Sequence, residues 1–453
     1  MKHLPVLTKA ADLNGIYNAF EPHPLRTKEE LAEFYNSDTM EVRTGDRYRS
    51  PMISLLEACT RPSNQNAHLL LGHRGCGKST ELSNLKHEFV RRGQPTVIID
   101  ANSEMDIFRG NHWDIMILIT ESLCQIAKDI RDPVLWDRIE PVVERIRVFL
   151  NTEVTKETST IVDDEISVEA GAKLGTPSFL GGVLSLFSQA KVGLKYNEST
   201  REIVSEVMRK RVSEWVVYTR ALADHIITHL NGKQPILIFE GLDKVEPGER
   251  IFDIFKYRTL SEMSFPVIYT FPISQFYSPD FAMLGGAYHH HTLPMIKVIN
   301  IDGRRNDDGI ASVEKIVRQR IVDGVELFED GVLDKLIIKT GGLLRQLFES
   351  ISTAATRAKQ RPGITKIAME DAVSALNDIK SDLTRRLSGD DYDKLTEIYK
   401  DPNLKKDIQD KQFLLNMLKA LTVVEYNGQH WHDVHPLVVD YLKEREKANA
   451  NKR

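Results

Sequence analysis

The stretch AHLLLGHRGCGKSTELSNL, residues 67–85, constrains the chain more than any other feature. An apolar run ends at Gly72, four residues follow, and Gly77, Lys78 and Ser79 then precede an amphipathic pattern. This spacing is the P-loop pattern G-x-x-x-x-G-K-[ST], in which a strand runs through a glycine-rich turn into a helix. A chain of this length is expected to contain on the order of 0.02 chance matches. The stretch therefore predicts a domain that binds the phosphates of a nucleotide.

Each residue type in this loop has a chemical reason. The glycines let backbone N–H groups approach a polyphosphate and allow the positive φ angles of an anion-binding turn. The helix that begins near Lys78 points the positive end of its dipole at the same phosphates. The Lys78 ammonium is expected to reach the β- and γ-phosphates, and the Ser79 hydroxyl to reach Mg²⁺. We therefore expect ATP and Mg²⁺ as cofactors, with nucleotide contacts from Gly72, Arg74, Gly75, Cys76, Gly77, Lys78, Ser79 and Thr80.

Strands and helices alternate on both sides of this loop. Short apolar runs that indicate buried strands occupy 67–71, 95–100, 235–240 and 265–274, and helical patterns occupy 51–59, 78–93 and 113–130. Such alternation predicts a parallel sheet covered by helices, and hence an α/β fold.

A carboxylate for the metal is expected on a second strand, and ILIFEGLDKV at 236–245 carries two. Glu240 ends the strand, and we expect it to hold Mg²⁺ together with Ser79. Asp243 is expected to orient water or to contact the metal, and the alternative for it is the N-cap of the next helix. P-loop proteins normally have Asp where Glu240 stands, and this longer side chain bears on the efficiency of hydrolysis.

An insertion at 133–200 interrupts the alternation. It contains a polar, β-prone stretch at 151–170 and an apolar stretch rich in Gly and Ser at 171–198. We expect the second stretch to form a hairpin packed on the domain, and the alternative is a membrane-touching or assembly element. A long helix follows and stops at Asn231-Gly232. Its apolar stripe comprises Val204, Met208, Val212, Trp215, Leu222 and Ile226.

Composition restricts the remaining classes. The net charge of the 453 residues is -5, so the general basic excess typical of nucleic-acid-binding proteins is absent. The three cysteines form neither a disulfide framework nor a zinc pattern, and the start of the chain lacks the apolar core of a signal peptide. We therefore expect a cytoplasmic protein with no membrane partner.

Two smaller features have plain interpretations. His289, His290 and His291 are consecutive and cannot all face one metal from a regular element, so we expect a solvated loop rather than a metal site. Cys76 lies within the P-loop, where a small residue is needed. The alternative is that the helix dipole makes its thiol oxidisable.

The order of motifs resembles that of the AAA+ and STAND ATPases, and most of all their initiator-type (origin-recognition-like) members. The matching segments are the P-loop, EGLDK at 240–244, the strand ending VIYT, SVEKIVRQRI at 312–321 and TGGLLRQLFESISTAATRA at 340–358. The resemblance covers roughly residues 50–445. It implies a helical lid and a C-terminal winged helix beside the P-loop sheet.

The resemblance also implies roles for single residues. Thr270 would be the polar sensor that contacts the nucleotide, and Arg345 the lid arginine that touches the γ-phosphate. Arg320, or Arg318 beside it, would be offered to a neighbouring subunit. Catalytic roles are thus expected for Lys78, Glu240, Asp243 and Arg345. The family often has a second acidic residue beside the strand-end carboxylate, and Gly241 stands there instead, which favours a slow switch over a fast motor.

Four domains follow from these patterns. They are an N-terminal arm at 1–45, an ATPase core at 46–300 with its insertion at 133–200, a helical lid at 301–380 and a winged helix at 381–453. The last is indicated by a helix, two strand-like pieces around Asn427-Gly428 and a final helix. The expected fold class is therefore an α/β P-loop NTPase with a helical lid and a C-terminal winged-helix domain.

Two hypotheses about function remain. The first is an ATP-binding, slowly hydrolysing AAA+/STAND-type switch that couples nucleotide state to self-assembly or to an effector protein. By the resemblance, such a switch serves in a bacterial stress or anti-phage system. The second is a DNA-binding initiator or loader ATPase, against which the near balance of acidic and basic residues after 381 counts. The expected partners are ATP and ADP, with a second copy or an effector under the first hypothesis and nucleic acid under the second.

Overall fold

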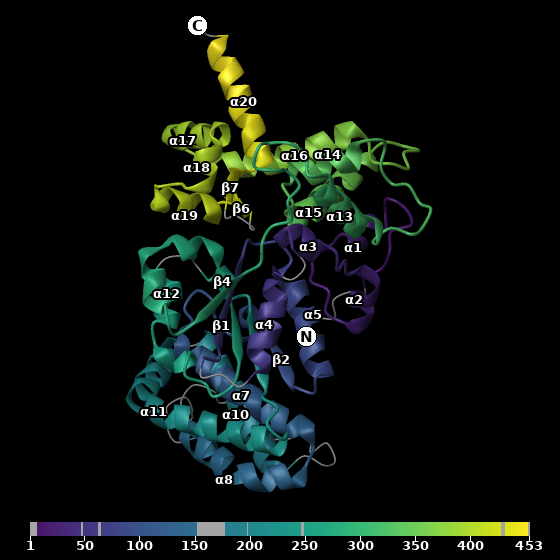
Figure 1. Ribbon diagram of the computed structural model, residues 1–453. Coiled ribbons are helices and arrows are strands. Elements are labelled where there is room, and N and C mark those ends of the chain that lie inside the picture. Colours follow the sequence, from purple (N-terminus) through teal and green to yellow (C-terminus); the bar gives the residue numbers. More distant parts are fainter. Residues whose placement is uncertain are drawn as a thin grey trace.

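A five-stranded parallel sheet forms the centre of the molecule, in the strand order β2-β3-β4-β1-β5 (Figure 1). The computed structural model describes residues 7–46, 49–61, 65–151, 177–196, 198–245, 249–426 and 431–451. The strands are β1 (Ala67–Gly72), β2 (Thr96–Asp100), β3 (Ile236–Glu240), β4 (Val267–Pro272) and β5 (His289–Thr292). This architecture confirms the expected α/β, P-loop NTPase-like fold class, with β1 inside the sheet.

The strands bury side chains on both faces. Leu69 and Leu71 belong to an apolar core that they share with the insertion. Leu70 points to the opposite face and belongs to a core that it shares with α5. Helix α5 starts after Gly77, whose φ is 102°, and Gly93, with a φ of 80°, follows its end. The helices around the sheet are α4 (Pro51–Thr60), α5 (Lys78–Arg91), α6 (Ala101–Glu104), α7 (His112–Ile130) and α12 (Glu249–Phe255). Short 3-10 turns are η3 (Leu242–Lys244), η4 (Arg258–Leu260), η5 (Ile273–Tyr277) and η6 (Pro279–Leu284).

The insertion is a layer of helices beneath the sheet in Figure 1. It consists of α8 (Pro133–Leu150), α10 (Ser178–Tyr196) and the start of α11 (Glu198–His229), packed with α7. The prediction of a hairpin is therefore wrong for residues 178–196. These residues form a helix, because Leu180, Val183 and Phe187 are buried at helical spacing. Gly181 and Gly182 misled the prediction. The polar stretch at 152–170 lies outside the described residues, and no described helix meets the length and apolarity that crossing a membrane requires.

The long helix α11 has the buried stripe that its spacing predicts. Val204, Met208, Trp215, Leu222 and Ile226 are buried in the core that α7 and α8 share. The backbone is non-helical at Arg211, where the helix kinks. Asn231 and Gly232 have φ angles of 54° and 87° just after its end, so the expected stop is confirmed.

Two further helical groups follow the sheet. The first contains α13 (Asp307–Arg318), α14 (Val332–Lys339), α15 (Leu344–Ala358) and α16 (Met369–Thr384), and we call it the lid. The second, which we call the C-terminal section, contains α17 (Gly389–Lys400), α18 (Pro402–Lys406), α19 (Lys411–Lys419), the hairpin of β6 (Val423–Tyr426) and β7 (Trp431–Val434), and α20 (Pro436–Ala450). The turn expected at Asn427-Gly428 lies outside the described residues. Both groups share one apolar core.

The N-terminal arm runs between α5 and the lid (Figure 1). Its helices are α1 (Ile16–Ala19), α2 (Lys28–Phe34) and α3 (Thr39–Thr44). Ala10 forms a parallel bridge with Ile321, and the ring of Phe20 lies edge-on to Phe348 at 5.6 Å between centroids. The arm is therefore part of the lid core and closes one side of the structure.

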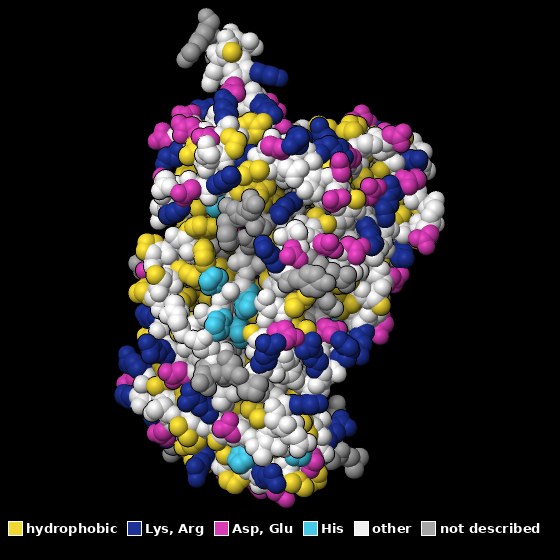
Figure 2. Space-filling model, in the orientation of Figure 1, with side chains coloured by type: hydrophobic (Ala, Val, Ile, Leu, Met, Phe, Trp, Pro, Cys, Tyr) yellow, Lys and Arg dark blue, Asp and Glu magenta, His cyan; other side chains and the backbone are white. Residues whose placement is uncertain are grey.

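Strand β5 corrects the expectation for the three histidines. His289–His291 pair in parallel with β1 at the edge of the sheet instead of forming a loop, because β1 would otherwise expose its own edge there. His291 Nε2 lies 3.3 Å from Nδ1 of His68, and burial lowers the pKa of His68 to about 3. Figure 2 shows histidine side chains gathered on this face.

Candidate nucleotide-binding site

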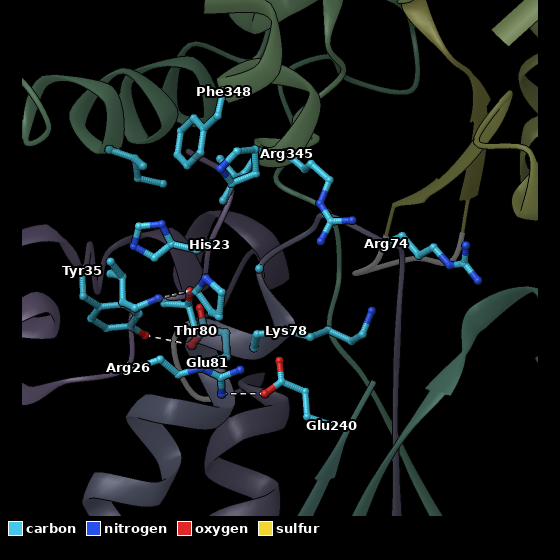
Figure 3. A pocket seen from close by; sticks show the side chains of 18 of the residues that line it. His23, Arg26, Tyr35, Arg74, Lys78, Thr80, Glu81, Glu240, Arg345 and Phe348 are labelled. Carbon is cyan, nitrogen blue, oxygen red and sulfur yellow. Dashed lines mark hydrogen bonds and ion pairs between the residues drawn. The ribbon is translucent and has the colours of Figure 1, made fainter. Parts of the chain in front are cut away.

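A cavity of about 360 Å³ lies where the P-loop, the strand ends, the lid and the arm meet (Figure 3). Most of the residues predicted to contact nucleotide or metal line it. These are Arg74, Gly75, Gly77, Lys78, Ser79, Thr80, Glu240, Asp243, Thr270 and Arg345. The parallel topology explains the gathering, since the carboxyl ends of β1, β3 and β4 share one edge of the sheet.

Two predicted contact residues do not line the cavity. Gly72 lies behind the loop, where a Cβ would come within 3.2 Å of Cys76 Sγ and of the Leu293 carbonyl oxygen. Cys76 is fully buried, and its side chain belongs to the core beside α4 and α5. Both residues therefore pack beneath the loop and do not face the cavity. The buried position of Cys76 agrees with the interpretation that a small residue is needed there.

The P-loop holds its lysine in a folded-back position. Lys78 Nζ donates hydrogen bonds to the carbonyl oxygens of Gly72 and His73 at 2.9 and 3.0 Å, and it forms an ion pair with Asp243 at 2.8 Å. Burial acts to lower the pKa of Lys78, but the Asp243 carboxylate outweighs burial, so that this pKa is raised. Likewise, burial acts to raise the pKa of Asp243, but Lys78 holds it below its usual value. The pair keeps both groups charged inside the protein.

The strand-end carboxylate Glu240 is followed by a turn that Thr270 holds in place. Glu240 is in register with Asp100, the last residue of β2. Thr270 Oγ1 accepts a hydrogen bond of 3.0 Å from the Leu242 backbone N–H, which fixes the turn after Glu240. Gly241 has a φ of 88°, and a Cβ there would lie 2.1 Å from Asn102 Nδ2. A side chain at position 241 would therefore strain the backbone and displace Asn102.

The N-terminal arm supplies a wall of the cavity that the sequence did not reveal. The Arg26 guanidinium lies 2.6 Å from Glu240 Oε2, and the Leu25 N–H donates to Thr80 Oγ1 at 3.3 Å. Tyr35 donates to the Glu81 carboxylate at 2.9 Å. Pro22 and Pro24 were the available signal, since prolines in close succession favour extended backbone laid over a surface.

A fully buried arginine ties the arm to the P-loop. Arg43, in α3, donates to the carbonyl oxygen of Cys76 at 2.6 Å and to that of Pro294. Both acceptors are backbone carbonyls, so no carboxylate pattern in the sequence marked this residue. Arg43 therefore fixes the back of the phosphate-binding turn from a segment that lies far away along the chain.

The lid approaches the P-loop through α15. The backbone N–H of Arg345 donates to the Gly75 carbonyl oxygen at 3.3 Å, and its side chain lines the cavity. Arg320 is only 4% exposed and lies over the ring of Phe348 at 4.4 Å, so this arrangement does not offer it to a neighbouring subunit. Arg318 forms ion pairs with Glu314 and Glu326 on the surface.

The C-terminal section contacts the P-loop as well. The Glu425 backbone N–H donates to His73 Nε2 at 2.8 Å, and burial lowers the pKa of His73 to about 4. The hydroxyl of Tyr277, in η5, donates to the Glu425 carboxylate at 2.9 Å and lies 2.9 Å from His432 Nε2. The hairpin β6–β7 is thus docked directly behind the phosphate-binding turn.

The residues present fit a magnesium nucleotide. Gly75 and Gly77 have φ angles of 81° and 102°, which open the turn for an anion. Among the described residues, Glu240 Oε2 and both ring nitrogens of His23 are buried without a hydrogen-bond partner. His23 lies beside Tyr35 and Phe348 in Figure 3. The cavity therefore combines a phosphate cradle, a carboxylate for metal and unused polar groups.

The fold and this cavity together define a P-loop NTPase-like architecture. No protein-family model matches the chain, and no curated protein matches it. Among solved structures the chain is similar to Cdc6p from Pyrobaculum aerophilum, at 11% sequence identity and a TM-score of 0.35, over 95% of this chain and 98% of that one. It is also similar to the Orc1 protein of Aeropyrum pernix, solved in complex with DNA, at 12% identity and a TM-score of 0.34, over 89% and 96%. Scores this low carry no conclusion about function.

Proposed function

We propose that the chain is an ATP-binding, slowly hydrolysing regulatory switch of the AAA+/STAND type. The observation that supports this proposal is that the lid and the C-terminal section both hydrogen-bond to the P-loop itself. The lid does so from Arg345 N–H to the Gly75 carbonyl, and the C-terminal section from Glu425 N–H to His73. Because these contacts share one short turn, a change in that turn acts on both units.

The residues of the site suggest how the change arises. Lys78 leaves Asp243 for the β- and γ-phosphates, because the phosphates offer more negative charge than one carboxylate. Ser79 and Glu240 would hold Mg²⁺, which would neutralise the phosphate oxygens. Asp243 is then free to orient water, and Arg345 reaches the γ-phosphate from the lid. The absence of a second acid at Gly241 favours slow hydrolysis.

The output of the switch is proposed to be assembly with a second copy or with an effector protein. We expect Lys78→Ala to lose nucleotide affinity by about 100-fold, because a charged hydrogen-bond donor to phosphate is removed. Size-exclusion light scattering with ADP, ATP and a non-hydrolysable analogue measures the outcome. Wild type is expected to gain mass with the analogue, and Lys78→Ala to remain unchanged.

A matched control is Lys256→Ala, since Lys256 forms an exposed ion pair with Asp253 and does not line the cavity. It should assemble like wild type. If Lys78→Ala assembled normally on addition of ATP, a nucleotide-driven switch would be ruled out.

A second candidate function is DNA loading. The succession α17, α18, α19, hairpin and α20 favours it, since it is the element order of a winged helix. Against it, α19 packs on η5 of the core, so the helix that would enter a groove is covered. Repeating the light-scattering series with duplex DNA distinguishes the two. A mass shift that requires DNA and weakens with salt supports loading.

A further inference from the structure

The counter-ion of the metal-binding carboxylate comes from the N-terminal arm. Arg26 Nη1 lies 2.6 Å from Glu240 Oε2, and Figure 3 shows the two side chains end to end below Lys78. The Glu240 side chain is only 10% exposed, whereas that of Arg26 is 36% exposed. Arg26 therefore covers the carboxylate on its solvent side, and a metal ion reaches Oε2 only after the guanidinium moves.

The contact is one of charge alone. Glu240 Oε2 is buried and makes no hydrogen bond with any residue that the structure describes. The guanidinium thus neutralises the carboxylate without the directed N–H geometry that makes arginine pairs strong. A pair of this kind is readily exchanged for a cation that binds the same oxygen with higher charge.

The arm that carries Arg26 connects two parts of the site. On the core side, the Arg26 carbonyl oxygen lies 3.3 Å from His87 Nε2 on α5, next to the contact between Leu25 and Thr80. On the lid side, Arg320 donates to the Ala19 carbonyl oxygen at 2.6 Å, and Asn36 donates to the Ser312 carbonyl oxygen at 3.1 Å. A change at Arg26 is therefore transmitted along a segment held by both α5 and the lid.

We propose that Arg26 is a displaceable counter-ion that occupies the magnesium position of Glu240 until the metal replaces it. The exchange frees Arg26 and loosens residues 22–27 from α5. This inference rests on the proposed function, because it requires that a magnesium nucleotide binds at the P-loop. It adds to the proposed function that the arm is released by the metal and not by the nucleotide alone.

The test compares the magnesium requirement of wild type with that of Arg26→Gln. The measurement is binding of a fluorescent ADP analogue, titrated with Mg²⁺ and repeated in EDTA. Arg26→Gln lacks the competing guanidinium, so the Mg²⁺ concentration that gives half of the magnesium-dependent increase in analogue binding should fall by roughly three- to tenfold. Binding of the analogue in EDTA should stay the same. Arg26→Lys keeps a competing charge and should remain within about twofold of wild type.

A second readout follows the arm directly. Hydrogen exchange of residues 22–36 should increase in wild type when Mg²⁺ and nucleotide are added together, but not with nucleotide in EDTA. In Arg26→Gln the exchange should be high from the start and insensitive to Mg²⁺. Arg61→Gln is the matched control, because Arg61 is 75% exposed and pairs with Glu57 at 2.8 Å on α4, away from the cavity.

Each outcome separates the two proposals. If wild type binds no nucleotide, the proposed function fails and this inference fails with it. If wild type binds nucleotide but Arg26→Gln has an unchanged magnesium requirement, only this inference fails. Weaker binding of the magnesium complex by Arg26→Gln would overturn it as well, since Arg26 would then be a phosphate ligand.

Discussion

Charged side chains in the cavity are paired with one another. Lys78 is paired with Asp243, and Arg26 with Glu240, so each of these two carboxylates has a counter-ion within the site. Removing one member of a buried pair is costly because the other is left as an uncompensated charge. The site is therefore stable as it stands, and under the proposed function ligand binding would exchange these ionic partners.

His73 makes the P-loop sensitive to acid. Its pKa is lowered by burial from 6.5 to about 4. Between these values the unfolded chain binds a proton at His73 and the folded chain does not, so the free energy of unfolding falls as the pH falls. The expected slope is about 1 kcal/mol per pH unit.

We expect His73→Gln to remove this contribution. The glutamine side chain still offers an acceptor to the Glu425 N–H but does not titrate. Urea unfolding of both proteins between pH 4.5 and 8 measures the slope, and the two should agree within about 1 kcal/mol at pH 8. Other buried histidines act equally in both proteins, so identical slopes would show that His73 is not the source.

At the scale of elements, the lid and the P-loop touch through backbone. Gly75 has a φ of 81°, and a Cβ there would lie 2.7 Å from Arg345 Cβ. Gly324 has a φ of 80° with open space around it. Comparing substitutions at these two glycines therefore distinguishes the effect of backbone strain from that of the lid contact.

We expect Gly324→Ala to cost about 1 kcal/mol of unfolding free energy, from the left-handed backbone alone. Gly75→Ala should cost about 2–4 kcal/mol, because α15 must also move away. Chemical denaturation measures both, and nucleotide titration should show a loss of affinity for Gly75→Ala only. An equal loss of unfolding free energy in the two variants would mean that α15 moves away from Gly75 without a measurable energetic cost.

The elements also show where sequence reasoning reaches its limit. The four core strands and α5, α7 and α11 were predictable, because each has a continuous apolar run or a helical stripe. Helix α10 was missed since Gly181 and Gly182 suggested a turn, and β5 was missed since three histidines have no strand-like alternation. In the site, the P-loop and Glu240 follow from local spacing. Arg26 and Arg43 could not be found, because their partners lie far away in the chain and include backbone carbonyls.

At the scale of the whole molecule, the C-terminal section is held to the core by a buried polar cluster. Tyr277 shares its hydroxyl between Glu425 and His432, both of which are about 5% exposed. Tyr277→Phe removes this hydroxyl and should weaken docking by about 1–3 kcal/mol.

The expected result is a larger radius of gyration by small-angle X-ray scattering and faster hydrogen exchange in α19. Tyr17→Phe, with a ring that is 75% exposed, is the control and should behave as wild type. An unchanged radius with normal protection of α19 in Tyr277→Phe would mean that apolar packing alone holds the section in place.

The contacts of the arm also bear on the order in which the chain is made. Asn36 bonds to a residue 276 positions later, and Ala10 pairs with Ile321. During synthesis the arm emerges long before these partners, and non-local contacts of this kind form slowly. The arm's contacts with α5 and with Glu240 join segments that are made earlier, whereas its lid contacts must wait for residues 312–321. Closure of the cavity by the lid is therefore a late step, although the arm that forms one wall precedes the sheet in the chain.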